Sequence, residues 1–398
     1  MFDNTSPKNK TCSACGTSPV NHRFMFVSSA LDEIVDVLNN FFLKNISSSK
    51  WWQRASDLIE KAIFNTFHFI GLARFEKDTK KALNGRSKLI WEEARRRGIP
   101  MEQIVVGGRN TDHYRAKIMG KNYYFQSLPI PSHIPQKGYS WIDDKFKLAK
   151  KLREWKIPAP ESRIARTWGD ALFAFKALQK PLIIKPKYGS RGRHTTTNIN
   201  TVEELKEAFS LAKVISPSLV VQEHLSGSVY RATVIDGKLV GFFRADPPNV
   251  LGDGKNSIAK LIESKNKNRH ERISAISISD ETINFLKRQG HSLESIPKGG
   301  EVVNLSAKTG RMYGGYTKEM LPWVHPKMHG IFEKAGELAS APVLGFDLII
   351  GDATKDPDFE RWGIIECNSL PFIDLHYFAL EGEPIDLAKN VWDLWDKK

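Results

Sequence analysis

Two predicted strands within residues 345–371, joined by a polar loop, place the strongest constraint on the fold. Their bounds are Gly345–Gly351 and Trp362–Cys367. Strand side chains alternate between faces, so Glu366 and Asn368 project to the same side of the second strand, and Asp347 can face them from the first. Three converging oxygen ligands suit a hard cation, and Mg2+ is normally held by one or two carboxylates together with substrate phosphates. This stretch therefore predicts a paired sheet that carries a metal site on one face.

The length and composition are those of a globular protein with more than one domain. At 398 residues, with 41% hydrophobic and 26% charged residues, the chain is long enough for two or three domains. No run reaches the roughly 18 uninterrupted apolar residues of a membrane-spanning helix, and the N-terminus lacks a signal-peptide pattern. The three cysteines form no disulfide framework, which agrees with a reducing compartment. We therefore expect a cytoplasmic protein.

The net charge of +14 is concentrated towards the N-terminus. Residues 1–140 hold 21 Lys and Arg against 12 Asp and Glu, whereas residues 141–398 hold 38 against 33. A basic half attracts anions such as nucleic acid, a membrane surface, ATP or an acidic substrate. A solvated basic surface is the favoured interpretation, because no aromatic and basic RNA-binding signature accompanies the charge. Nucleic-acid binding is disfavoured but stays open, as does a homodimer.

The polar segment 1–22, expected to be a mobile or loosely docked tail, contains two closely spaced cysteines. Cys12 and Cys15 have the spacing of a metal-binding pair, but a zinc site needs four ligands. Only His22 is near enough in sequence to be an obvious third ligand, and the chain has no second Cys-x-x-Cys. The sequence therefore favours two free thiols over a metal site.

Residues 1–85 are predicted to form a helical region and residues 86–138 a small α/β unit. An amphipathic helix follows a Ser cap over Ser28–Lys44, and a second helical stretch covers Ser49–Leu83. Trp51 and Trp52 are assigned to a core rather than to a partner or membrane surface. The α/β unit is expected to contain a helix, a strand and a hairpin, at Lys88–Arg97, Gln103–Val106, and Tyr114–Met119 with Asn122–Leu128.

Residues 139–398 alternate between helical and strand patterns. A Thr-x-x-Glu capping box at Thr201 and Glu204 opens one of the helices. The predicted helices are Asp143–Trp155, Gly169–Leu178, Thr201–Leu211 and Ser257–Lys265. The predicted strands are Leu182–Lys185, Leu219–Gln222 and the hairpin Tyr230–Phe243, which turns at Asp236-Gly237.

A strand that delivers a lysine into a glycine-containing loop, IIKPKYGSRGRH at residues 183–194, suits a nucleotide triphosphate. Glycines let the backbone approach phosphates, and lysine supplies a point charge. The loop lacks the Gly-Lys-Ser/Thr of a Walker A sequence. One lysine about 4 Å from a phosphate oxygen contributes on the order of 4 kcal/mol before desolvation, so several cations are expected to share the task. Lys145 and Lys185 are the leading candidates.

Two further groups of residues fit a nucleotide and an acidic substrate. The strand end at Gln222–Leu225 can offer backbone groups to an adenine edge between apolar neighbours, although an ordinary strand end looks the same. Arg231 and Arg244 lie on the two strands of the predicted hairpin and are expected to face whatever lies over the sheet. Arginine binds carboxylate or phosphate with two parallel hydrogen bonds, and surface ion pairing is the alternative.

Taken in order, these pieces resemble the ATP-grasp family over about residues 139–395, and most closely the ATP-grasp regions of cyanophycin synthetases and of bifunctional glutamate-cysteine ligase/glutathione synthetases. The long-range order carries the resemblance, since no single piece is specific. The pieces are DDKFKLAKKL, IIKPKYGSRGRHTTTNI, VVQEHLSG followed by YR, VLGDGKNSIAKLI, GGEVVNLSAKTGRMYGG, VHP, GFD, GIIECNSLP and EGEPIDLAKNVWDLW. The implied fold is α+β, with two lobes that hold ATP between them, preceded by the small α/β unit and the N-terminal helical region.

The resemblance implies an ADP-forming ligase that activates an amino-acid or peptide carboxylate as an acyl phosphate, which an amine then attacks. It implies ATP and Mg2+ as cofactors, with two ions and with Mn2+ as an alternative. The implied catalytic residues are Arg231, Arg244 and Lys185. The implied ATP-binding residues are Lys145, Lys185, Lys187, Gly189, Ser190, Arg191, Gly192, Gln222, Glu223, His224 and Leu225. The implied metal ligands are Asp347, Glu366 and Asn368.

Three positions depart from the family pattern. Val229 stands where relatives usually place an acidic ribose-binding residue, so ribose is expected to be held elsewhere, with Glu223 as a candidate. His194 stands where relatives often have glycine, and Gly315–Lys318 replaces a loop richer in hydroxyl groups and Asp. The acyl donor and the amine therefore stay open. An ATP-grasp-type kinase, or a non-catalytic nucleotide- or nucleic-acid-binding protein that kept the fold, are the alternatives.

Overall fold

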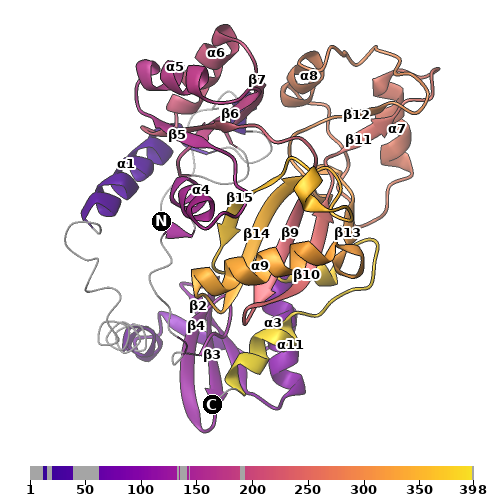
Figure 1. The fold of residues 1–398 in the computed structure, drawn as a ribbon. Helices are drawn as coiled ribbons and strands as arrows, with labels where there is room; N and C mark the ends of the chain where they lie inside the picture. The colour runs from indigo at the N-terminus through magenta and orange to yellow at the C-terminus, as the bar shows by residue number, and fades with distance from the viewer. Residues whose placement is uncertain are drawn as a thin grey trace.

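The computed structural model describes residues 12–15, 20–38, 62–131, 134, 141–142, 144–188 and 193–396. Within these residues the chain forms three sheets of four or five strands and one two-stranded sheet. Figure 1 shows a small purple sheet at the bottom, a central sheet above it, and two further lobes at the top. None of the helices in this described part is long and apolar enough to cross a membrane.

The small sheet is antiparallel throughout, with the strand order β1-β2-β3-β4. Its strands are β1 (Ala73–Glu76), β2 (Met101–Val106), β3 (Arg109–Ile118) and β4 (Lys121–Gln126), and its helix is α3 (Gly85–Arg96). The helix, strand and hairpin predicted for this part of the chain are confirmed. α3 begins after Asn84, whose side chain accepts a hydrogen bond from the Ser87 backbone N–H.

The predicted helical stretch up to Leu83 is wrong at its C-terminal end. Residues 62–69 are helical, and the chain then turns at Gly71, which has a φ of 75° and donates its N–H to the His68 carbonyl. A glycine in the left-handed region is a common helix stop because it has no Cβ. The next residues form β1, which pairs with β2. The small sheet therefore draws on residues from both sides of position 86.

The first helix begins earlier than the predicted Ser28 cap. α1 spans His22–Leu38, and the Asn21 side chain accepts a hydrogen bond from the Phe24 N–H at 3.1 Å. Asn is a good helix N-cap for this reason.

The apolar face predicted for this helix is exposed where the structure describes it. Leu31 is 56% exposed and Ile34 is 54% exposed. The rest of the predicted helix, at residues 39–44, lies outside the described residues, as does the segment that contains Trp51 and Trp52.

A second sheet, with the order β5-β8-β6-β7, is covered by two helices and forms the upper-left lobe of Figure 1. Its strands are β5 (Ser162–Ala165), β6 (Leu182–Pro186), β7 (Thr196–Ile199) and β8 (Leu219–Glu223), and its helices are α5 (Trp168–Ala177) and α6 (Val202–Lys213). The predicted capping box is present, since Thr201 accepts from Glu204 N and the Glu204 carboxylate accepts from the Thr201 N–H. A separate apolar core holds this lobe together.

The central sheet has the order β13-β10-β9-β14-β15. Its strands are β9 (Ser228–Ile235), β10 (Lys238–Ala245), β13 (Thr317–Glu319), β14 (Val343–Ile350) and β15 (Gly363–Asn368), and it contacts α4 (Lys145–Glu154) and α9 (Pro326–Ala339). α9 crosses one face of this sheet (Figure 1), where the Phe332 ring packs on Phe242, Phe346 and Trp362. α4 lies against the edge strand β15.

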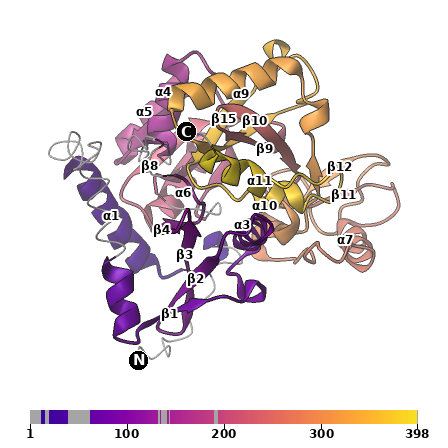
Figure 2. The ribbon, with the colours of Figure 1, turned by 90° about the horizontal axis from the view of Figure 1, so that it is seen from below.

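Two smaller parts complete the fold. The upper-right lobe of Figure 1 contains β11 (Asn249–Leu251), β12 (Val302–Asn304), α7 (Ile258–Lys267) and α8 (Asp280–Lys287). The C-terminal helices are α10 (Asp374–Tyr377) and α11 (Ala388–Trp392). α11 packs beside α3, as Figures 1 and 2 both show, and Trp392 Nε1 donates to the Ile90 carbonyl at 3.0 Å. The C-terminal helix α11 is thus bound to α3, the helix of the small sheet.

Candidate active site

Three charged side chains lie in one row across three neighbouring strands of the central sheet. Asp347 on β14 is directly opposite Arg231 on β9, and it is also directly opposite Glu366 on β15. Asn368 pairs with Gly345, two residues along each strand from the Glu366–Asp347 pair. Residues two apart on a strand share a face, so Asp347, Glu366 and Asn368 lie on the same side of the sheet, as the alternation pattern predicts. Arg231 shares that side.

Arg231 and Asp347 form a two-pronged ion pair. Arg231 Nε donates to Asp347 Oδ1 at 2.5 Å and Nη2 donates to Oδ2 at 2.8 Å. Burial lowers the pKa of the Arg231 guanidinium, but Asp347 outweighs burial and leaves it raised. Burial also raises the pKa of the Asp347 carboxyl, which Arg231 opposes. Since both carboxylate oxygens accept from the guanidinium, the geometry supports the charged pair.

Gly345 makes room for this ion pair. A Cβ built at Gly345 would lie 2.8 Å from Arg231 Nη1 and 2.6 Å from Pro371 Cβ. The Arg231 side chain therefore lies over a position on β14 that only glycine can occupy without displacement. This contact gives a physical reason for the glycine of the Gly-Phe-Asp sequence.

The row of Arg231, Asp347 and Glu366 is called the carboxylate row. Two lysines approach it, one from α4 and one from the neighbouring lobe. Lys145 Nζ lies 3.7 Å from Glu366 Oε1. The start of α4 is fixed because Asp144 Oδ1 accepts hydrogen bonds from the N–H groups of Phe146 and Lys147. Lys145 thus connects α4 to the edge strand of the central sheet.

Lys185 is a buried cation beside this pair. Its Nζ donates to Gln222 Oε1 at 2.8 Å, and the residue is 8% exposed. Burial lowers the pKa of Lys185 to about 7, the positive charge of Lys145 acts in the same direction, and Glu366 opposes both. A phosphate group placed among these cations would offset the unfavourable proximity of Lys145 and Lys185.

Gln222 carries a polar atom without a hydrogen-bond partner among the described residues. Its side chain is buried, and Nε2 meets no acceptor within this part of the chain, although Oε1 accepts from Lys185. A buried donor without an acceptor costs free energy unless a ligand or water completes it. Together with two lysines and three oxygen ligands, this atom gives a donor set that fits a nucleotide with bound divalent metal. Each Asp347 oxygen also keeps a lone pair beyond its bond to Arg231.

The residues after Gln222, which were predicted to meet the adenine edge, also make contacts within the protein. The Glu223 carboxylate accepts hydrogen bonds from the backbone N–H groups of Glu161 and Gln179, at 3.3 and 3.4 Å. Glu223 thus binds neighbouring backbone, and its role in holding ribose stays a prediction. His224 is half-buried, Leu225 is buried, and burial together with the charge of Arg361 lowers the pKa of His224.

The predicted phosphate loop is described only at its two ends. Lys187 Nζ lies 2.7 Å from the Tyr188 hydroxyl and 3.9 Å from Asp144 Oδ2, which places it beside the start of α4. The loop residues Gly189, Ser190, Arg191 and Gly192 lie outside the described residues.

Arg244 does not join Arg231, although both were expected to face the same side of the sheet. Arg231 is paired with Phe243, so Arg244 projects from the opposite face. A β-bulge between Leu239 and Gly241 causes this offset. Arg244 Nε instead donates to Asp246 Oδ1 at 2.7 Å.

Arg244 therefore lies beside a second glycine-rich loop, at residues 310–316, rather than beside the carboxylate row. The Asp246 backbone carbonyl accepts from Gly310 N, and Asp246 N donates to the Tyr316 carbonyl. A Cβ at Gly315 would collide with the Asp246 carbonyl oxygen at 2.0 Å, so the loop packs tightly against the end of β10.

One residue that supports the site was missed by the sequence reasoning. Arg86, which is 4% exposed, donates from Nη1 to the Leu370 carbonyl at 2.7 Å and from Nη2 to Asp112 Oδ2 at 2.6 Å. Its guanidinium also lies over the Phe372 ring, 4.5 Å from the centroid. Arg86 thus fixes the turn that follows Asn368. No local motif signals this contact, because Arg86 and Leu370 are 284 residues apart.

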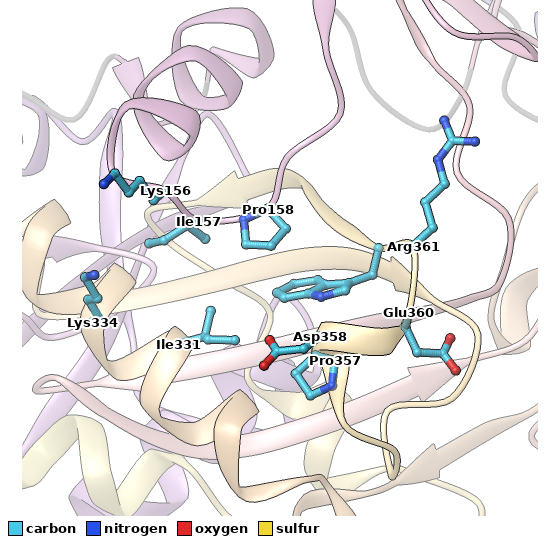
Figure 3. A pocket seen from close by; sticks show the side chains of 10 residues that line it. Lys156, Ile157, Pro158, Ile331, Lys334, Pro357, Asp358, Glu360 and Arg361 are labelled. Atoms are coloured by element: carbon cyan, nitrogen blue, oxygen red, sulfur yellow. The ribbon is translucent and has the colours of Figure 1, made fainter.

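Two cavities lie away from this cluster. The one in Figure 3 has a volume of about 570 Å³, and its labelled side chains come from the segment after α4, from α9 and from the β14–β15 connection. Arg361 points away from the other lining side chains in that view. The second, about 500 Å³, is lined by residues of α7 and by Gly314 and Tyr316. Neither contains a residue of the carboxylate row.

Comparison with known structures gives the fold of the chain. A crystal structure of a bifunctional glutathione synthetase from Pasteurella multocida superposes with a TM-score of 0.53 at 24% identity, over 78% of this chain and 43% of that one. No protein-family model matches the sequence. The chain has the ATP-grasp fold, in agreement with the predicted α+β class.

Curated relatives agree with the structural match. A cyanophycin synthetase from Geminocystis herdmanii is 30% identical over 268 residues, which are 65% of this chain and 30% of that protein. A bifunctional glutathione biosynthesis protein from Clostridium perfringens is 27% identical over 262 residues, which are 64% of this chain and 34% of that protein. The chain matches about a third of the length of these two relatives.

Proposed function

We propose that this chain is an ADP-forming carboxylate-amine ligase that joins an amino-acid or peptide carboxylate to an amine through an acyl phosphate. The observation that carries the proposal is the convergence of Lys145, Lys185 and Arg231 on Asp347 and Glu366. Phosphoryl transfer depends mainly on positioning and on neutralising phosphate charge, and needs no covalent nucleophile. The matches to a cyanophycin synthetase and to a bifunctional glutathione biosynthesis protein support the same reaction class.

The proposed roles follow from position. ATP phosphates would lie between Lys145, Lys185 and Lys187 and under the loop at residues 189–192. The adenine edge would meet the backbone at Gln222–Leu225. Asp347, Glu366 and Asn368 would hold Mg2+, with two ions and with Mn2+ as an alternative, and the metal would supply charge neutralisation at the phosphates.

Arg231 is proposed to place the substrate carboxylate or the transferred phosphate while it keeps Asp347 ionised. Arg244, on β10, is proposed to act from beside the glycine-rich loop at residues 310–316. The 500 Å³ cavity beside that loop has a volume suited to a small amino-acid or peptide substrate. Its lining residues include the cationic side chains Lys265 and Arg269, which favours a substrate with free carboxylates.

The domain limits also enter as proposals. We assign residues 1–85 to an N-terminal region of unassigned role, residues 86–138 to a small α/β unit and residues 139–398 to the ATP-grasp domain. The position of β1 in the small sheet and of α11 beside α3 supports a close association of these regions rather than independent modules.

A product search tests the reaction. Purified protein is incubated with Mg-ATP and pooled amino acids and dipeptides, ADP and phosphate are measured, and products are sought by mass spectrometry. The proposal predicts ADP release together with a condensation product. It also predicts that Glu366→Gln abolishes both, whereas Glu337→Gln, at an exposed position on α9, retains both. A stable phosphorylated product without an amide would identify a kinase, and no ADP release from the wild type would contradict both reactions.

A further inference from the structure

Two cysteines and two histidines meet where the N-terminal segment contacts the second lobe. Cys12 directly precedes the short 3-10 helix Ser13–Cys15, and Cys15 is its last residue. The histidines are His22 at the start of α1 and His194 just before β7. Their ligand atoms all lie within 4.8 Å of one another. Cys15 and His194 are each 1% exposed.

The distances between these atoms match the edges of a zinc tetrahedron. Cys15 Sγ lies 3.2 Å from His22 Nε2 and 3.5 Å from His194 Nε2, and Cys12 Sγ lies 3.7 Å from His194 Nε2. Zinc bonds of about 2.3 Å to sulfur and about 2.0 Å to nitrogen give sulfur–nitrogen edges of about 3.5 Å in a tetrahedron. Three of the six edges therefore have the length expected of a zinc site, and the other three are no longer than 4.8 Å.

The His194 ring is oriented for this role. Its Nδ1 lies 2.7 Å from the Leu211 carbonyl oxygen. A carbonyl oxygen only accepts, so Nδ1 carries the proton and Nε2 presents a lone pair towards the two sulfurs. A hydrogen bond from the second ring nitrogen to a backbone carbonyl is the usual support of a histidine that binds a metal.

The backbone at His194 gives an independent indication. His194 has a φ of 49°, in the left-handed region that favours glycine. Its N–H donates to the Ala14 carbonyl at 2.9 Å, so the backbone also binds the turn between the two cysteines. A side chain that tolerates this conformation and points into the cluster needs a reason, and metal binding supplies one.

We propose that Cys12, Cys15, His22 and His194 bind one zinc ion, which fastens the N-terminal segment to the second lobe. Two thiolates and two neutral imidazoles balance the charge of a divalent ion, and thiolate with imidazole is a donor set typical of zinc. Four protein ligands leave no open position, so the ion is structural rather than catalytic.

The sequence reasoning that favoured free thiols stopped at three ligands. His194 is 179 residues from Cys15, and no spacing rule connects them. In the second lobe the histidine is the last residue of the segment IIKPKYGSRGRH at residues 183–194. On the other side α1 is fixed further by Ser29 Oγ, which donates to the Ile215 carbonyl at 3.4 Å. The metal would thus join a segment to the lobe that otherwise contacts it through few polar groups among the described residues.

Metal analysis of tag-free, full-length protein grown with zinc tests the proposal without reference to activity. The expected result is about one zinc ion per chain. After zinc removal with a chelator, Co2+ should give the intense visible absorption of a tetrahedral site and sulfur-to-cobalt charge transfer. Protein without zinc, whose Co2+ form shows only the weak absorption of an octahedral aqua ion, would overturn the proposal.

Three variants identify the ligands. Cys15→Ser and His194→Asn should each weaken zinc binding at least about tenfold, and Asn is chosen because it tolerates a positive φ. His329→Gln, on α9 and outside the cluster, should keep the metal. Because ligand variants can fold poorly, thermal unfolding of the wild type with and without zinc is measured beside them and should show a lower midpoint without the ion. Full zinc retention in Cys15→Ser and His194→Asn would overturn the proposal. So would a wild-type unfolding midpoint that is the same with and without zinc.

Discussion

Arg231 Nε and Asp347 Oδ1 lie 2.5 Å apart on directly opposed positions of β9 and β14. Because Asp347 is also directly opposite Glu366, one row of the sheet carries a cation followed by two carboxylates. Lys145 closes the row from the outside, 3.7 Å from Glu366. The charge of each member therefore depends on its neighbours, and a change at one end of the row affects the other.

Loss of Arg231 should leave an uncompensated buried charge at Asp347. The Arg231 and Asp347 side chains are 14% and 21% exposed, and breaking such a pair from one side costs about 3 kcal/mol of unfolding free energy. Arg231→Met should therefore lower stability by this amount in urea unfolding. The double variant Arg231→Met with Asp347→Asn should recover part of the loss. Equal stability of Arg231→Met and the wild type would show that the pair contributes nothing.

Gly345→Ala should disturb the site through sterics alone. The new methyl group would lie within 3 Å of both Arg231 Nη1 and Pro371 Cβ, and such overpacking costs about 1–3 kcal/mol. ATP turnover should fall because the guanidinium is displaced. Gly330→Ala on α9 is the matched control, since nothing lies within 4 Å of its Cβ, and it should leave stability equal or raised by about 0.5 kcal/mol. Equal effects of the two substitutions would exclude the steric explanation.

Binding of Mg-ATP should be linked to proton uptake at Lys185. Burial lowers the pKa of this lysine to about 7, and nearby phosphate would raise it, so at pH 8 the complex should take up close to one proton. Calorimetry in two buffers of different ionisation enthalpy measures this number. Lys185→Met should abolish the uptake, and an uptake that persists in Lys185→Met would assign the proton to another group.

The same lysine should make the stability of the nucleotide-free protein rise with pH. The unfolded chain holds this proton up to about pH 10.4, whereas the folded chain loses it near pH 7. Between these values the unfolded state binds more protons, so the contribution of Lys185 favours folding increasingly as pH rises. The unfolding free energies of wild type and Lys185→Met are measured in urea at pH 6 and pH 9. The wild type should gain more stability between these pH values than Lys185→Met, whereas equal changes would show that Lys185 titrates normally.

A buried polar network lies on the same face of the central sheet as Arg231 and should stabilise it. His376 Nδ1 lies 2.6 Å from Glu319 Oε2, and His376 Nε2 lies 2.7 Å from Thr233 Oγ1. All three residues are fully buried. His376→Ala would leave Glu319 and Thr233 without this partner and should cost about 3 kcal/mol in unfolding free energy. Thr233→Val removes one bond only and should cost about 1 kcal/mol. A smaller loss for His376→Ala than for Thr233→Val would contradict this account.

The elements that sequence predicts well are those with local signals. The capping box of α6, the Asp236-Gly237 turn and the alternation along β15 are written in adjacent residues, and the structure reproduces them. β1 was missed because its strand character depends on pairing with β2, about 30 residues later. The same limit applies to Arg86 and to His194, whose partners lie far along the chain.

The two arginines of the β9–β10 hairpin show how one residue changes a site prediction. A regular hairpin that turns at Asp236-Gly237 would place Arg231 and Arg244 on the same face. The bulge between Leu239 and Gly241 adds one residue to β10. Every later side chain of β10 therefore projects from the opposite face to the one it would have in a regular hairpin. Gly241 is a local signal of the bulge, since a glycine inside a strand often marks one.

The account depends most on the claim that the site activates a carboxylate by phosphorylation. Once a substrate pair is found, the acid is supplied with oxygen-18 in its carboxylate, and phosphate and amide are analysed by mass spectrometry after turnover with Mg-ATP. An acyl phosphate transfers one carboxylate oxygen to the phosphate released and leaves the other in the amide, so each phosphate formed with amide should carry one labelled oxygen. Phosphate without label, formed in step with ADP, would contradict carboxylate activation at the row of Arg231, Asp347 and Glu366.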